Sequence, residues 1–142
     1  GYTIRSLYFD DRNNSALQEN LSGVDRRSKF RIRIYAGSTK VIHLEEKRKL
    51  SGMTQKSAWN LTEEECRLYM GYEQSAMHPV MQAKGLKPAC IVEYDRFAFV
   101  EPTGNVRITF DTNIRGSHDT DAFLDKDADM ALILPRESTF LK

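Results

Sequence analysis

Alternation of polar and apolar residues in several separate segments constrains the fold of this chain more than any other feature. Residues 29–35 read Lys-Phe-Arg-Ile-Arg-Ile-Tyr, residues 41–49 and 106–111 follow the same scheme, and residues 92–99 follow it more weakly. Side chains alternate faces along a β-strand, so each segment would carry one polar face and one apolar face. The pattern predicts antiparallel strands that bury their apolar faces.

The polar faces of these predicted strands are mostly cationic. They carry Lys29, Arg31, Arg33 and Tyr35; His43, Glu45, Lys47 and Lys49; Tyr94 and Arg96; and Arg107, Thr109 and Asp111. Arginine offers a planar donor fork that matches phosphate oxygens, and like charges on neighbouring strands repel unless an anion lies among them. A sheet with one face in water also alternates in this way. The pattern alone therefore leaves a solvated face and an anion-binding face as open alternatives.

Charge is segregated along the chain, although the formal net charge is only +1. Residues 26–49 hold nine Lys or Arg against Glu45 and Glu46, whereas residues 111–129 hold six Asp against Arg115 and Lys126. A basic segment inside a neutral protein indicates an anionic ligand at a defined place more than attraction to nucleic acid. Asp111 and the aspartates of residues 119–129 lack the spacing of a calcium loop and are interpreted as a solvated face.

The remaining segments predict an α+β domain built on a curved sheet or barrel, with the whole chain, residues 1–142, as one domain. Further strands are expected at residues 2–10 and 89–101, with an extended stretch up to residue 61, a hairpin loop at 36–39 and a turn at 102–105. Helices are expected at 62–70, where Thr62 and Glu65 form a capping box, at 74–84, and for one or two turns at 14–21. Residues after Gly116 are expected to form a loop with a short helix.

Several classes of protein and site are disfavoured. The three histidines are scattered without zinc-like or triad-like neighbours, and the chain has no glycine-rich phosphate loop. Cys66 and Cys90 lack Cys-x-x-Cys spacing and are expected to be reduced, buried thiols. The apolar runs are too short to span a bilayer and no signal peptide opens the chain, so we expect a cytoplasmic protein without a membrane segment.

Two further charged residues are ambiguous when each is considered alone. Lys56 is typical of a surface lysine. Glu45 would suit Mg²⁺, which takes one or two carboxylates besides phosphates and water, but it would equally suit a cross-strand arginine.

Five segments together resemble the VTC domain of polyphosphate polymerases, within the wider CYTH or triphosphate-tunnel superfamily. They are Ile-Arg-Ser-Leu-Tyr-Phe-Asp at 4–10, Arg-Ile-Arg-Ile-Tyr at 31–35, Leu-Glu-Glu-Lys at 44–47 with Lys56 shortly after, Tyr-Asp-Arg-Phe-Ala-Phe at 94–99, and Val-Arg-Ile-Thr-Phe-Asp-Thr at 106–112. Each segment is weak alone, but their order and spacing extend over nearly the whole chain.

The resemblance implies a tunnel of antiparallel strands with a basic lumen. Its partners would be a nucleoside triphosphate and polyphosphate, and the terminal phosphoryl group would pass to a polyphosphate chain with Mn²⁺ or Mg²⁺ as cofactor. Carried over to this chain, the catalytic residues would be Arg31, Arg33 and Lys56, the further phosphate ligands Lys47, Arg96 and Arg107, and Glu45 a candidate metal ligand. Lys56 and Arg96 are assigned mainly by the resemblance, since the alternation already places the other cations on polar faces.

Two parts of the family pattern are not found in this sequence. The family usually has an earlier strand with a Glu-x-Lys pattern and a last strand of the Leu-Glu-Val-Lys kind, whose Glu is the main metal ligand. We therefore expect a barrel that lacks its first and last strands, with open edges that could pair in an oligomer. Activity is expected of the intact enzyme and not necessarily of this chain alone.

Three rival functions are considered beside the polymerase. A triphosphate hydrolase of the same fold and a non-catalytic polyphosphate- or inositol-phosphate-binding module are the alternatives. A nucleic-acid binder is disfavoured, because the basic face carries few aromatic residues besides Tyr35 for base stacking.

Overall fold

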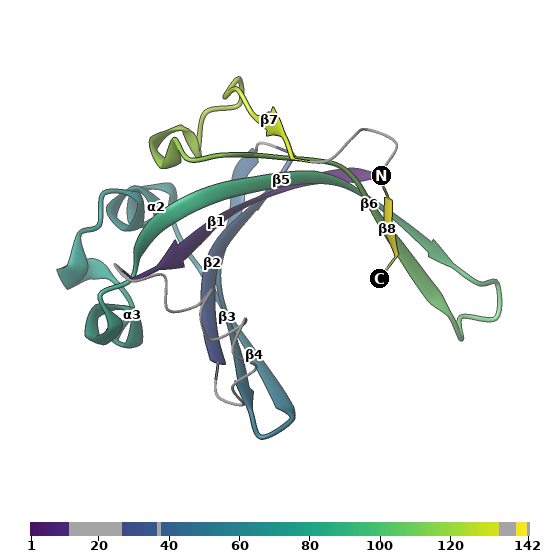
Figure 1. The fold of residues 1–142 in the computed structure, drawn as a ribbon, viewed down its shortest axis with the longest axis horizontal. Helices are drawn as coiled ribbons and strands as arrows, with labels where there is room; N and C mark the ends of the chain where they lie inside the picture. Colours follow the sequence, from purple (N-terminus) through teal and green to yellow (C-terminus); the bar gives the residue numbers. More distant parts are fainter. Residues whose placement is uncertain (12–26, 37, 134–138, 142) are drawn as a thin grey trace.

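One strongly curved antiparallel sheet forms the body of the protein. The computed structural model describes residues 1–11, 27–36, 38–133 and 139–141. The strands follow the order β4-β3-β2-β1-β5-β6-β7, and β8 pairs with β6 (Figure 1). Their bounds are β1 Tyr2–Asp10, β2 Arg27–Tyr35, β3 Ser38–Leu50, β4 Met53–Asn60, β5 Lys87–Val100, β6 Arg107–Ser117, β7 Ala131–Leu132 and β8 Thr139–Leu141. The sheet bends into an arch whose described strands do not close into a complete barrel, as the sequence predicted.

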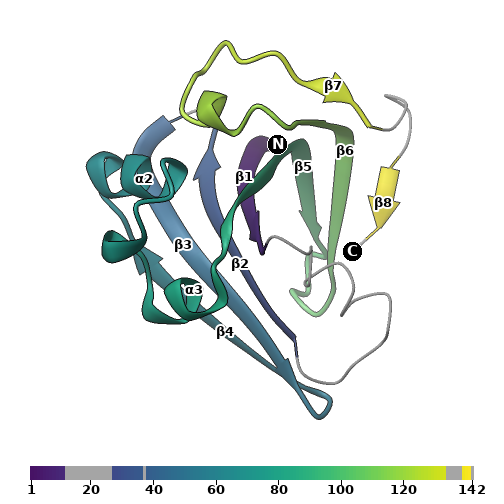
Figure 2. The same ribbon diagram turned by 60° about the vertical axis from the view of Figure 1, so that its left-hand side comes forward.

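The helices cover the convex side of the sheet. Helix α2 (Glu63–Met70), the 3₁₀ turn η1 (Gln74–Ala76) and helix α3 (Pro79–Lys84) lie between β4 and β5 in the chain and pack outside the arch (Figure 2). Thr62 and Glu65 cap α2 reciprocally, which is the predicted capping box. The core under these helices joins apolar residues of the convex face to buried helical residues such as Cys66 and Met81.

The alternation of the strands sets the two faces of the arch. Phe30, Ile32 and Ile34 are nearly inaccessible to solvent and point into the core. Arg31 and Arg33, which alternate with these apolar residues, are directed to the opposite, concave side. Arg31 is opposite Glu45 of β3, and Arg33 is opposite His43. Burial of the apolar positions thus fixes which residues line the concave face.

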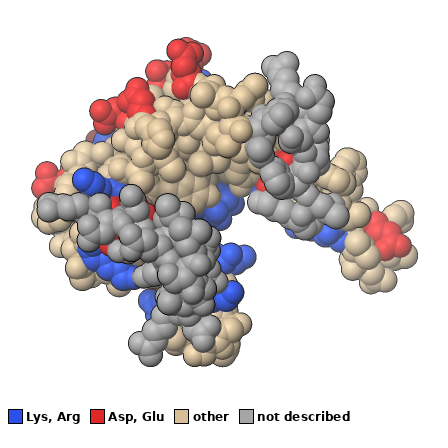
Figure 3. Space-filling model, viewed as in Figure 1, with Lys and Arg blue, Asp and Glu red and all other residues tan. Residues whose placement is uncertain are grey.

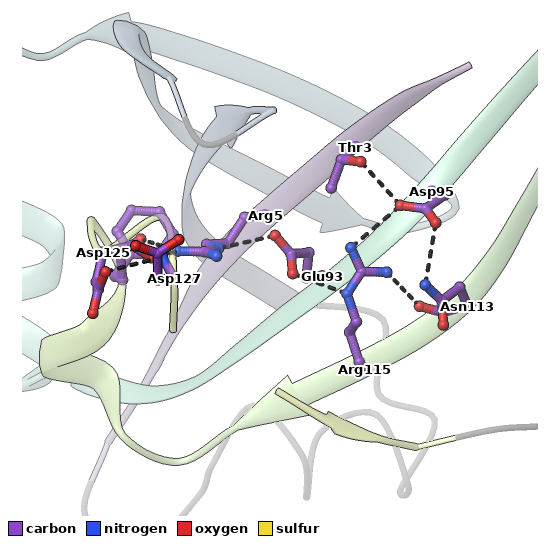
Figure 4. A network of polar contacts seen from close by, with 9 residues as sticks. Thr3, Arg5, Glu93, Asp95, Asn113, Arg115, Asp125 and Asp127 are labelled. Atoms are coloured by element: carbon purple, nitrogen blue, oxygen red, sulfur yellow. Dashed lines mark hydrogen bonds and ion pairs between the residues drawn. The ribbon is translucent and has the colours of Figure 1, made fainter. Parts of the chain in front are cut away.

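Arg5 holds the Asp-rich segment against the convex side of the sheet (Figure 4). Its guanidinium donates to Glu93 Oε1 at 3.1 Å and to the backbone carbonyls of Phe123 at 2.8 Å and Asp125 at 2.6 Å. Phe123, beside the 3₁₀ turn η2 (Thr120–Ala122), is fully buried in the core. The aspartates of residues 119–129 are exposed, as a solvated face requires, while the backbone and Phe123 anchor their segment.

Some predicted elements differ from those observed. The helix expected at 74–84 is split at His78 and Pro79, where His78 Nδ1 accepts a hydrogen bond from the Val80 amide and caps α3. Strand β6 continues to Ser117, past the expected end at Asp111. The helical turns expected at 14–21 lie outside the described residues.

The structure also bears on the state of the two cysteines and on whether the helices could cross a membrane. Cys66 and Cys90 are both free thiols, and burial raises the pKa of Cys66 to about 12. Within the described residues, the helices are too short and too polar to cross a membrane.

Candidate functional site: a basic pocket on the concave face

A pocket of about 430 Å³ lies against the concave side of β2, β3 and β4. Lys and Arg side chains gather along this inner side of the arch (Figure 3). The lining residues are Tyr8, Lys29, Phe30, Arg31, Arg33, Glu45, Glu46, Lys47, Lys56, Ser57 and Ala58. The structure therefore brings together Arg31, Arg33, Lys47, Lys56 and Glu45, five of the residues singled out in the sequence.

Strand register places three lysines side by side at one end of the pocket. Lys29 is opposite Lys47 on β3, and Lys47 is opposite Lys56 on β4. Desolvation and the positive charges of Lys56, Lys29, Arg31 and Lys49 lower the pKa of Lys47. Adjacent strands lie about 4.8 Å apart, so this row of like charges repels itself unless an anion lies across it.

Glu45 is shared by the two arginines at the centre of the pocket. Arg31 Nε donates to Glu45 Oε1 at 2.7 Å, and Arg33 Nε lies 3.8 Å from the same oxygen. Burial works against the charge of Arg31, but Tyr8 and Glu45 outweigh it, and the pKa of Arg31 is raised. Tyr8 also accepts a 3.4 Å hydrogen bond from Arg31. Arg31 therefore stays cationic beside this carboxylate, which Arg33 also approaches.

Arg33 is a buried cation with an unsatisfied donor. Its side chain is only 10% exposed, and its Nε–H finds no hydrogen-bond acceptor among the described residues. Its Nη2 donates to the Tyr94 hydroxyl at 3.2 Å. A buried donor without an acceptor costs about 1–3 kcal/mol, so an anionic oxygen at this point would be stabilised.

Arg96 and Arg107 lie outside this pocket. Arg96 forms a two-bonded ion pair with Asp111, at 2.8 and 3.2 Å, and donates to the Tyr94 hydroxyl at 3.2 Å. The hydrogen bond with Asp111 raises the pKa of Arg96. Arg107 is exposed at the start of β6, opposite Val100. The solvated face predicted for Asp111 is wrong, because this carboxylate is 2% exposed and paired.

The carboxylates of the pocket are already engaged by side chains of the protein. Glu45 pairs with Arg31, and Glu46 accepts from Ser28 at 2.9 Å and lies 3.4 Å from Arg48. The described part of the chain contains no group of three or more His, Cys, Asp or Glu side chains that could hold a metal ion. The residues present therefore do not form a metal site on their own.

Three residues of the site were not assigned roles from the sequence. Tyr8 sits opposite Arg31 on β1, Tyr94 joins Arg33 to Arg96, and Lys29 completes the lysine row. The alternation had placed Lys29 and Tyr94 on polar faces. The contacts of both tyrosines depend on the β1–β2 and β1–β5 registers, which short-range patterns do not give.

Comparison with known proteins places the chain in a family. A profile of the VTC domain matches residues 1–140. Among solved structures, the chain is similar to a "putative adenylate cyclase" of Bacillus halodurans at 15% identity and a TM-score of 0.57, over 83% of this chain and 59% of that one. It is also similar to a "putative adenylyl cyclase" of Hippeastrum described as having a dominant triphosphatase activity, at 12% identity and a TM-score of 0.49, over 82% and 60%.

The likeness to the Bacillus halodurans structure shows the fold alone. The chain spans about three fifths of the length of the two solved proteins. No curated protein matched the sequence. The profile match over nearly the whole chain, together with the open tunnel-type sheet, shows that this protein belongs to the VTC domain family.

Proposed function

We propose that the concave face binds a nucleoside triphosphate and polyphosphate, and that the intact domain transfers the terminal phosphoryl group to a polyphosphate chain. The observation that carries the proposal is the pocket in which Arg31, Arg33 and the lysine row surround one carboxylate. Membership of the VTC domain family supports the same assignment. Enzymatic activity, substrate and product are thus all part of the proposal.

The pocket supplies what phosphoryl transfer asks of a protein, which is mainly positioning and positive charge. Arg31, Arg33 and Lys56 would hold the triphosphate, and Lys47 the next phosphate along. An oxygen of the chain's terminal phosphate would attack the γ-phosphorus while the bond to the β-phosphate oxygen breaks. A nucleoside diphosphate would leave, and no side-chain nucleophile is required.

Arg96 and Arg107 are assigned to phosphates further along the concave face. Arg96 is held in place by Asp111 and is linked to Arg33 through the Tyr94 hydroxyl, which accepts from both arginines. The cation Mn²⁺ or Mg²⁺ belongs to the proposal for the intact enzyme. Since the described residues form no metal site, that cation enters here only as a variable of the experiment.

Calorimetric titration of tripolyphosphate tests the site directly. We expect tight, stoichiometric binding, and preference over a single-stranded oligonucleotide of matched charge at physiological salt. Arg31→Ala and Arg33→Ala should each weaken tripolyphosphate binding by at least about tenfold, because a hydrogen bond to a charged group contributes about 1.5–3 kcal/mol. The titration is run with and without Mn²⁺.

Arg67→Ala is the matched control for these variants. Arg67 lies on α2, is 61% exposed, and pairs with Glu63 on the helical side of the sheet. It should bind tripolyphosphate like the wild type. Equal affinities for wild type, Arg31→Ala and Arg33→Ala would show that this pocket does not hold phosphate.

A non-catalytic phosphate-binding module is the second candidate. The ion pairs that already engage Glu45 and Glu46 favour it, because they leave no carboxylate of the pocket ready for a metal. Tight tripolyphosphate binding without nucleotide turnover in the full-length protein would select this function. If turnover occurs, separation of products on a gel distinguishes polyphosphate synthesis from hydrolysis.

A further inference from the structure

Three aromatic rings form a cluster on the concave face outside the residues that line the basic pocket. Tyr2 and Tyr35 have ring centroids 6.3 Å apart, and Tyr35 and His43 have centroids 6.5 Å apart. They come from three adjacent strands, β1, β2 and β3. None of the three lines the pocket, which ends at Arg33 on this side.

The aromatic cluster continues the line of arginines along β2. Arg31, Arg33 and Tyr35 occupy alternate positions of one strand, so their side chains follow one another at about 6.6 Å along the same face. His43 is directly opposite Arg33, and Tyr2 is opposite Arg96. The lysine row lies at the other end, two positions before Arg31. The concave face therefore has a basic end and an aromatic end.

The rings are accessible and are not stacked on one another. Tyr2 is 41% exposed, and Tyr35 and His43 are half-buried. The ring planes meet at 53° for Tyr2 and Tyr35 and at 82° for Tyr35 and His43. In neither pair are the two rings stacked face to face, so a planar base could stack on one ring without displacing the other.

The geometry points to a nucleoside subsite formed by Tyr2, Tyr35 and His43. The base would stack on these rings, and the triphosphate would run over Arg33 and Arg31 to Lys56. Lys47 and Lys29 would hold the next phosphates, those of the polyphosphate chain. This inference rests on the proposed function and adds a direction to it. Stacking on aromatic rings does not depend on which base is present, so purine nucleoside triphosphates should bind with similar affinities.

A comparison of two ligands separates this subsite from the phosphate pocket. Calorimetry measures the affinities of ATP and tripolyphosphate for the wild type, Tyr35→Leu and Tyr2→Leu. Removing a ring on which the base stacks should weaken binding, so ATP affinity should fall by about tenfold in at least one variant. Tripolyphosphate affinity should stay within about twofold of the wild type in both.

Two further variants control the measurement. Tyr35→Phe keeps the ring and loses the hydroxyl, and it should bind ATP like the wild type. If the hydroxyl of Tyr35 bound the nucleotide, this variant would bind ATP more weakly. Phe99→Leu removes another exposed aromatic ring, 59% exposed and packed on Phe110, and should change neither affinity. Thermal melting checks that every variant is folded.

The outcomes distinguish failure of the subsite from failure of the proposed function. Unchanged ATP affinity in both leucine variants, or an equal loss for ATP and tripolyphosphate, would overturn the nucleoside subsite while leaving phosphate binding standing. If the folded wild type binds neither ligand, the proposed function fails, and the subsite fails with it. A selective loss for ATP supports the subsite.

Discussion

Glu45 acts as an internal anion in the free pocket. Its Oε1 atom is 2.7 Å from Arg31 Nε and 3.8 Å from Arg33 Nε, so one oxygen faces two cations. A phosphate ligand carries more charge and more acceptor oxygens than this carboxylate, and it could also satisfy the unpaired Nε–H of Arg33. The structure shows Glu45 as a cross-strand partner of arginine, one of the two roles that the sequence left open for it.

The Arg96–Asp111 pair should matter for stability. Asp111 is 2% exposed and Arg96 is largely buried, so Asp111→Asn would leave a guanidinium without its matching charge. Removing one partner of a buried ion pair costs about 3–5 kcal/mol. We expect a loss of at least about 2 kcal/mol in the free energy of urea unfolding, since Arg96 retains some contact with water.

Asp121→Asn is the control for that prediction. Asp121 is exposed in the 3₁₀ turn η2, so its free energy of unfolding should stay within about 0.5 kcal/mol of the wild type. If Asp111→Asn were as stable as this control, the pair would not be the stabilising contact described here.

Sequence patterns predicted which residues share the concave face better than they predicted the partners of those residues. Alternation placed Arg31 and Arg33 on one face because the intervening Phe30, Ile32 and Ile34 are buried on the other, and alternation along β3 placed Lys47 with His43 and Glu45. It did not predict the burial of Asp111, which depends on pairing with Arg96 across the β5–β6 register. Partners on other strands are fixed by tertiary structure, and a local pattern does not contain that information.

At the scale of elements, local sequence signals correctly predicted where α2 begins and where α3 ends. The capping box of α2 is observed, and Gly85 ends α3 in the left-handed conformation, with φ +64°. The helix expected over 74–84 was wrong because Pro79 lacks the N–H that an internal helical position needs and instead starts α3. Strand β6 continues past Asp111 because Asn113, at φ +54°, accommodates a bulge against β5.

A network of polar side chains on the convex side of the sheet, centred on Glu93 and Asp95, is a second feature that short-range patterns did not predict. Arg115 donates to Glu93 at 2.9 Å and to Asp95 at 3.2 Å, and Thr3 and Asn113 also donate to Asp95. Burial opposes the charge of Asp95, but hydrogen bonds from Asn113, Thr3 and Arg115 outweigh it and lower the pKa of Asp95. The network joins β1, β5 and β6 on the side of the sheet away from the pocket (Figure 4).

Arg5→Met should release the Asp-rich segment from this network. Methionine retains much of the apolar stem but loses the donors to Glu93 and to the carbonyls of Phe123 and Asp125. We expect amides of residues 119–128 to exchange hydrogen at least about tenfold faster, because local opening no longer breaks those bonds. Mass spectrometry of exchanged peptides measures this change.

The peptide of α2 is the internal reference for the exchange experiment. Helix α2 packs on the core, and the Arg5 hydrogen bonds among the described residues go to Glu93, Phe123 and Asp125. Its exchange should therefore change less than that of residues 119–128. Uniform acceleration across both peptides would mean that Arg5 stabilises the whole fold and does not act as a local anchor.

At the scale of the whole molecule, the arch separates a stabilising face from a binding face. The convex side carries the apolar core, the helices and the Arg5 network. The concave side gathers cations whose mutual repulsion lowers the pKa of Lys47. A surface arranged in this way opposes folding of the free protein and gains stability when an anion binds.

Lys47→Gln should therefore stabilise the free protein while it weakens phosphate binding. Lys47 faces Lys29 on one side and Lys56 on the other, and relief of like-charge cross-strand pairs is worth about 0.2–1 kcal/mol. We expect the free energy of urea unfolding to rise by about 0.5 kcal/mol at low salt. The gain in stability should shrink at high salt, where screening already relieves the repulsion.

Tripolyphosphate affinity should fall in the same Lys47→Gln variant. Lys84→Gln, exposed in the last turn of α3 and not among the pocket residues, removes an equal charge and should produce neither effect. A variant that lost stability at low salt, or bound tripolyphosphate like the wild type, would contradict the view that the lysine row is kept for an anion.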